Sequence, residues 1–139
     1  MGYRGFATLL MIALIGSVGC GGDIRSDELS RSIDTLVSSA REGALIAQGV
    51  ADDGTKTTFV RVRARELTEA TDHEAEKLSD ASADQALESD KKAAVALSSQ
   101  ISDVLGQLQV SPMDPVSASK VAKHLERLAD KSEKLQRDL

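Results

Sequence analysis

The sequence DPVSASKVAKHLERLADKSEKLQRDL, residues 114–139, decides the fold of this chain. It begins with Asp114 and Pro115, an acceptor side chain followed by a residue that has no amide to satisfy in the first helical turn. Small and aliphatic side chains then follow a strict seven-residue repeat: Ala118, Val121, Leu125, Leu128, Ser132, Leu135 and Leu139. The repeat predicts an amphipathic helix that packs along one face against other helices.

Three segments upstream carry the same helical period. Residues 27–50 form a stripe of Leu29, Ile33, Leu36, Ala40, Ala44 and Ala47. Residues 57–79 form a second stripe of Val60, Ala64, Leu67, Thr71, Ala75 and Leu78. The third segment, about 82–108, carries Leu87, Ala94, Leu97, Ile101, Val104 and Leu108. Side chains at spacings of three and four lie on one face of a helix, so the sequence predicts four helices.

The boundary between the second and third helices is weakly marked, because residues 78–87 contain neither Pro nor Gly. One continuous helix over 57–108 is the alternative. The apolar stripe changes phase in this stretch, however, and Ser82 and Gln85 stand at the spacing of a capping box. We therefore expect a break here, with the third helix starting at Ser82.

The start of the second helix has a competing interpretation. Residues 57–63, TTFVRVR, alternate as a strand does and are rich in β-branched side chains. A lone strand would have no pairing partner elsewhere in the chain, and its backbone groups would stay unsatisfied. We therefore expect residues 57–63 to be helical.

Four helices of similar length with short connections predict an all-α, antiparallel up-and-down four-helix bundle over residues 27–139. The alternative is a long two-helix hairpin, which would form if the helix continued through residues 78–87. Gly43, inside the first helix, either allows a close approach of another helix or marks a frayed end. Small residues on the stripes predict little buried volume per helix, so we expect modest stability, or further burial through self-association or a partner.

The N-terminal 20 residues have the layout of an export signal. Arg4 precedes an apolar run over 6–15, and SVGC follows at residues 17–20. This layout resembles the lipobox of bacterial lipoproteins, although Ser17 stands where Leu is usual. An ordinary cleaved signal or a transmembrane anchor is the alternative, but an uninterrupted apolar run of about ten residues is short of the roughly 20 that span a bilayer.

The lipobox resemblance implies a division of the chain and a location. Residues 1–19 would be the signal peptide, and residues 20–26 the lipidated Cys20 with a short tether. The acyl chains, such as palmitate, would bind the mature protein to the membrane. The protein would be exported and anchored to the outer face of the cell membrane or to the outer membrane.

Composition excludes several functional classes. The formal net charge of −5 argues against nucleic acid as the main partner. Aromatic residues make up 2% of the chain, which disfavours the stacking platforms of sugar-binding and nucleotide-binding sites. No Gly-flanked Ser resembles a nucleophile elbow, and no Gly-rich phosphate loop is present. We therefore expect neither an enzyme nor a cofactor.

A metal site has two weak candidates, His73 and Glu69, which lie one helical turn apart. Carboxylate-caged metal bundles place a Glu three residues before a His on inward-facing positions. Here Ala70 occupies the position three residues before His73, and His73 is off the apolar stripe. We therefore expect both residues to be ordinary surface residues.

Arg61, Arg63 and Arg65 lie in the first turns of the second helix, where the helix dipole disfavours cations. Asp52 and Asp53 in the preceding turn are the simplest compensating charges, and Arg65 can also pair with Glu69. The functional alternative is a basic tip that binds an acidic partner. These three arginines are therefore the candidate interaction residues.

The function that these features favour is that of a lipid-anchored envelope protein with a non-catalytic protein-interaction or scaffold role. Its expected partners are the membrane, through the N-terminal lipid, and another envelope protein or a second copy of the chain. Two alternatives stay open: a small metal-binding helical bundle, and an inhibitor of an extracytoplasmic enzyme.

Overall fold

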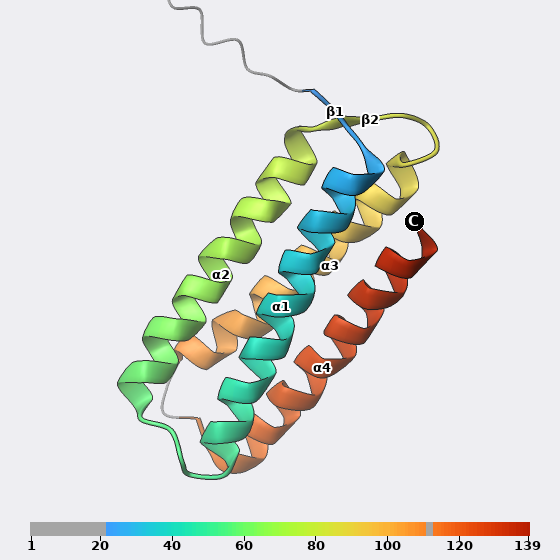
Figure 1. Cartoon of the computed structure of the whole chain (residues 1–139). Helices are drawn as coiled ribbons and strands as arrows, with labels where there is room; N and C mark the ends of the chain where they lie inside the picture. Colours follow the sequence, from blue (N-terminus) through green and yellow to red (C-terminus); the bar gives the residue numbers. More distant parts are fainter. Residues whose placement is uncertain (1–21, 111–112) are drawn as a thin grey trace, which may run out of the picture.

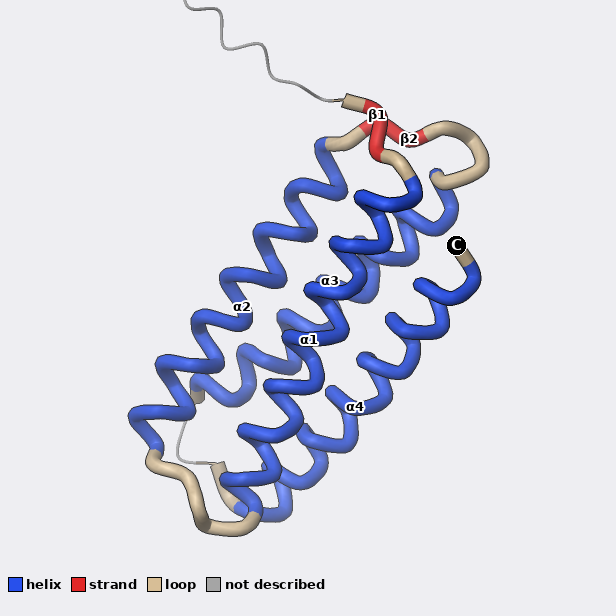
Figure 2. The backbone as a smooth tube through the Cα atoms, viewed as in Figure 1, coloured by secondary structure: helices blue, strands red, loops and turns tan. Residues whose placement is uncertain are grey.

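A computed structural model describes residues 22–110 and 113–139 (Figure 1). Within these residues the chain forms four long helices: α1 (Ser26–Ala51), α2 (Thr57–Asp80), α3 (Glu88–Gln109) and α4 (Pro115–Asp138). Successive helices run in opposite directions and lie side by side (Figures 1 and 2). The predicted all-α, antiparallel four-helix bundle is confirmed, and the two-helix hairpin is wrong.

The predicted stripes form the core of the bundle. All six stripe residues of α1 are buried, as are the α4 residues from Ala118 to Ser132 in the seven-residue repeat. The main apolar cluster joins all four helices. A second cluster fills one end of the bundle and contains Ile24, Leu29, Ile33, Leu78 and Ala94. Helical periodicity alone therefore identifies most of the side chains that hold the bundle together.

Gly43 lies where α1 approaches two other helices. A Cβ atom at this position would stand 2.4 Å from Cδ2 of Leu105 in α3 and 3.0 Å from Cδ1 of Leu125 in α4. Real Cβ atoms do not approach other heavy atoms to 2.4 Å. Gly43 therefore allows a close approach of helices, the first of the two interpretations.

The start of α4 matches its sequence signal. One carboxylate oxygen of Asp114 accepts hydrogen bonds from the amides of Val116 and Ser117, each at 3.0 Å. Hydrogen bonding from the side chain and the amide of Ser117 lowers the pKa of the Asp114 carboxyl. Pro115 is the first residue of the helix. Local chemistry fixes this boundary, because all of its groups lie within three residues.

The break between α2 and α3 is present, but its details differ from the prediction. Residues 57–63 are helical, so the strand alternative is wrong. The third helix begins at Glu88 instead of Ser82. Ser82 belongs to a short strand, and the carboxylate of Asp84 accepts a hydrogen bond from the Leu87 amide at 2.9 Å. The predicted capping box therefore does not start α3.

A two-stranded parallel sheet closes the end of the bundle where the described chain begins (Figure 2). Strand β1 (Asp23–Ile24) pairs with β2 (Ser82–Ala83), so that Ile24 stands opposite Ala83. We call this the tether end, because it contains residues that the sequence assigns to the tether. The C-terminus of α4 lies at the same end (Figure 1). The far end is where α1 leads into α2 and α3 leads into α4.

Candidate functional site

The lipidation candidate, Cys20, lies outside the described residues. Asp23 and Ile24, three and four positions after Cys20, pair with β2 as strand β1. Ile24 is only 6% exposed and packs in the apolar cluster with Leu29, Ile33 and Leu78. Asp23 and Ile24, which the sequence assigns to the tether, are therefore part of the folded structure.

The metal candidates do not form a site. His73 and Glu69 are both exposed on α2. Glu69 pairs instead with Arg65 at 3.8 Å. The described residues bring together no group of three or more His, Cys, Asp and Glu side chains that could hold a metal ion.

Arg63 connects α2 to α1. Its Nε donates to Oε1 of Glu42 at 2.5 Å, and its Nη1 donates to Oε2 of Glu66 at 2.7 Å. These hydrogen bonds, above all the one that Arg63 donates to Glu42, raise the pKa of Arg63 above its usual range. Arg63 is half-buried, so its charge is already engaged within the protein. Arg63 is therefore better placed to hold the helix pair than to meet a partner.

The other two arginines remain at the surface of α2. Arg61 and Arg65 are both exposed. Asp52 and Asp53 in the turn are the expected partners of these arginines. Arg63 and Arg65 instead pair with carboxylates on α1 and α2. Asp52 instead accepts a hydrogen bond from Nε2 of Gln48 at 3.0 Å. Of the three interaction candidates, Arg61 and Arg65 are the more accessible.

Exposed apolar side chains gather toward the far end, which the sequence did not predict. The large apolar residues that are exposed in the described ranges are Leu45 (74%), Phe59 (55%), Val62 (44%), Val110 (79%) and Val116 (65%). Phe59, Val62 and Val116 are in the first two turns of their helices, and Val110 follows α3. Their positions off the apolar stripes were the available signal. We call Phe59, Val62, Val110 and Val116 the far-end apolar group.

A groove runs along the outer surface between α1 and α4 and has two hollows. The near hollow, about 390 Å³, is lined by Arg41, Ala44, Leu45, Glu126, Ala129 and Asp130. The far hollow, about 460 Å³, is lined by Gln48, Ala51, Asp52, Pro115, Val116, Ser119, Lys120 and Lys123. Both hollows are open to solvent, and charged and small side chains line them. The groove suits another protein surface better than a small enclosed ligand.

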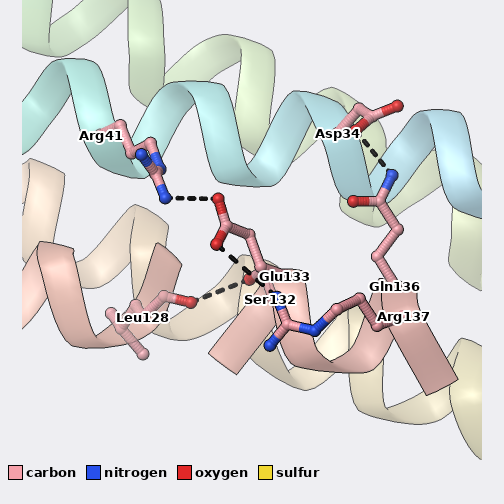
Figure 3. A network of polar contacts seen from close by, with 7 residues as sticks. All are labelled: Asp34, Arg41, Leu128, Ser132, Glu133, Gln136 and Arg137. Atoms are coloured by element: carbon pink, nitrogen blue, oxygen red, sulfur yellow. Dashed lines mark hydrogen bonds and ion pairs between the residues drawn. The ribbon is translucent and has the colours of Figure 1, made fainter. Parts of the chain in front are cut away.

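A polar seam joins α1 and α4 beside the near hollow (Figure 3). Arg41 forms an ion pair with Glu133, and Arg137 lies 4.0 Å from the second carboxylate oxygen of Glu133. Farther toward the tether end, Nε2 of Gln136 donates to Oδ1 of Asp34 at 2.6 Å. These contacts fix the relative position of the two helices that form the groove.

The described surface thus offers apolar side chains and charged groups for contact with another molecule. None of the described helices has the length and apolarity that crossing a membrane requires. Comparisons of the chain with models of protein families, with curated protein sequences and with solved structures give no match. Function must therefore be argued from the sequence signal and from these surfaces.

Proposed function

We propose that this protein is an exported lipoprotein, anchored by acylated Cys20, that binds another envelope protein through the far end of its bundle. The role is that of an adaptor or scaffold and involves no catalysis. The observation that carries the proposal is the concentration of exposed apolar side chains away from the anchored end. The lipobox resemblance at 17–20 supports the anchoring.

The short connection supports an orientation with the tether end at the membrane. Ile24 is buried in the fold and follows Cys20 by four residues. A fully extended chain covers at most about 3.5 Å per residue, so four residues reach no farther than about 14 Å. A lipid on Cys20 would therefore hold the bundle close to the bilayer, with its helices leading away from it.

The far end would then be the part of the protein that meets other molecules. The 24 residues of α2 extend about 36 Å at a rise of 1.5 Å per residue. Single exposed apolar residues are common, and the far-end apolar group supports a contact surface because its four members, from α2, the end of α3 and α4, lie at the same end of the bundle. Arg61 and Arg65 stand beside Phe59 and Val62 in the sequence of α2, which favours an acidic partner surface.

An inhibitor of an extracytoplasmic enzyme would use the same surface, so it is one form of this proposal. The metal-binding alternative has no observation in its favour, because His73 and Glu69 are exposed and Glu69 pairs with Arg65. We therefore retain a protein-binding role alone.

Site-specific photo-crosslinking in the native host tests the far end. A photoreactive residue at Val62 is compared with one at Glu76, which is also exposed and lies 14 residues along the same face of α2. The two positions are about 21 Å apart along the helix. We expect a discrete crosslinked partner from Val62 and none from Glu76. Equal crosslinking at both positions, or at neither, would contradict the proposal.

Labelling with a palmitate analogue tests the anchor separately. The full-length protein should incorporate the label and fractionate with membranes, whereas Cys20→Ala should incorporate none. Labelling that persists in Cys20→Ala would show that Cys20 is not the acylated residue. The Val62 crosslink should also weaken in Cys20→Ala, because the protein would no longer be held beside its partner.

A further inference from the structure

Leu45 is the most exposed large apolar side chain within the four helices, and it lies beside a hollow that has a partly apolar lining. Its exposure is 74%. Leu45 itself lines the near hollow together with Ala44 and Ala129, which are largely buried, and charged side chains complete the lining. An exposed Leu between charged side chains of both signs is an arrangement that a second copy of the same surface can bury.

The charges of the groove change sign between its two hollows. In the near hollow, α1 contributes the cation Arg41 and α4 contributes the anions Glu126 and Asp130. In the far hollow, Asp52, which directly follows α1, is an anion, and α4 contributes two cations, Lys120 and Lys123. At each level of the groove, the α1 side and the α4 side therefore carry opposite charge.

This pattern is self-complementary under a two-fold axis that runs parallel to the bundle. Such an axis places α1 of one copy opposite α4 of the other at the same level. Asp52 then faces Lys120 and Lys123 of the second copy. Arg41, which already pairs with Glu133 of its own chain, faces Glu126 and Asp130 of the second copy and adds a smaller contribution than the Asp52 contact. Like charges would meet if the register shifted from one hollow to the other, so the charges also fix the register.

We propose that the α1–α4 groove binds a second copy of this chain in a parallel, two-fold symmetric dimer. Leu45 of each copy packs against the other near the axis, and opposite charges pair on both sides. The parallel direction rests on the proposed function, because it directs both tether ends to the same membrane. An antiparallel dimer would place the two anchors at opposite ends of the assembly.

The size of this surface indicates where the dimer forms. On the α1 side, the groove extends from Arg41 to Asp52, the residue after the helix, which is about 17 Å at the rise of a helix. With a width of two helices, about 20 Å, the surface covers roughly 350 Å² per copy. Stable dimers in solution bury about 800 Å² per copy. We therefore expect the dimer to depend on the high local concentration that anchoring in one membrane provides.

Cysteine crosslinking of the full-length protein in its native membrane tests the arrangement. Two differently tagged copies are co-expressed, one with Asp52→Cys and the other with Lys123→Cys, while Cys20 is occupied by its lipid. We expect at least about ten-fold more mixed dimer than from Asp52→Cys with Ser99→Cys. Ser99 is exposed on α3, diagonally across the bundle from α1, and serves as the matched control.

Two other outcomes would overturn the proposal. Efficient crosslinking of Lys123→Cys with Asp130→Cys, without crosslinking of the first pair, would show an antiparallel dimer. No mixed dimer above the control from an anchored protein would show that the groove does not bind a second copy. A third result, capture of a different protein by Lys123→Cys in place of the mixed dimer, would equally overturn it.

A substitution at Leu45 provides an independent measurement. Leu45→Asp, at an exposed position, should leave the circular dichroism spectrum unchanged and reduce the mixed dimer at least ten-fold, whereas Leu45→Met should retain it. Unchanged dimer in Leu45→Asp would contradict the role of this side chain. Membrane fractionation of the same samples reports on the anchor alone. Failure of the proposed function and failure of the dimer are thereby distinguished.

Discussion

The two ends of the bundle differ in how far their apolar side chains are buried. At the tether end the chain covers its own core, since β1 pairs with β2 and Ile24 is packed among buried residues. At the far end Phe59, Val110 and Val116 are left in contact with water. The fold itself gains little from those three side chains. The chain itself covers the tether end, whereas the far end keeps apolar side chains exposed, and this difference is what supports the proposed contact there.

Replacement of a core residue at the tether end should have the largest effect on stability. Leu78 is fully buried there, so Leu78→Ala should lower the free energy of unfolding by about 2–5 kcal/mol through lost burial and an unfilled cavity. Phe59→Ala at the far end should change it by less than about 0.5 kcal/mol. Denaturant unfolding followed by circular dichroism measures both. Similar losses for the two variants would contradict the distinction between the ends.

The middle of the bundle should also depend on close packing. Gly43→Ala places a methyl group against buried Leu105, and this overpacking should cost about 1–3 kcal/mol, more than the helix propensity it gains. Gly106→Ala is the matched control, because no atom lies within 4 Å of its Cβ position. It should stabilise the protein by up to about 1 kcal/mol. Thermal unfolding of both variants should give shifts of opposite sign.

A substitution in the short sheet at the tether end should change local opening more than global stability. Ile24→Ala removes the side chain that anchors β1. We expect the two-residue strand to open without unfolding the helices, so global stability should fall by only about 1 kcal/mol, less than for Leu78→Ala. Amide hydrogen exchange should become faster in β1 and β2 and stay unchanged in the middle of α1. Unchanged exchange at Ser82 and Ala83 would show that Ile24 does not hold the pairing.

The start of α4 at the far end should show the smallest effect, and one that depends on pH. The pKa of Asp114 is lowered in the folded protein, so its stabilising contribution is present above the unfolded pKa, about 3.9, and is lost as the pH falls through the folded value. Asp114→Ala should therefore lower Tm slightly at pH 7, and the difference from the wild type should shrink as the pH falls through the folded pKa of Asp114. Asp114→Ser keeps a cap without a titrating group. Its difference from Asp114→Ala should not depend on pH in this range.

Much of the helical framework was predictable, whereas the candidate surfaces were predictable only in part. The α4 start at Asp114 and the stripe of α1 follow from residues within one or two turns of each other. The start of α3 was mispredicted because Ser82 pairs with Asp23, a residue 59 positions away that gives no local signal. For the same reason, the sequence suggested Asp52 and Asp53 as partners of the arginines, whereas Arg63 reaches Glu42 on another helix.

The sequence by itself determined the helices, the stripes that form the core and the export signal pattern, because each depends on side chains that are close in the chain. Only the tertiary structure decided which surfaces the helices share. It packed Ile24 into the tether end, brought Gly43 against Leu105, and placed Leu45 beside a groove with alternating charges. These features depend on the order and depth of helix packing, which helical periodicity does not specify.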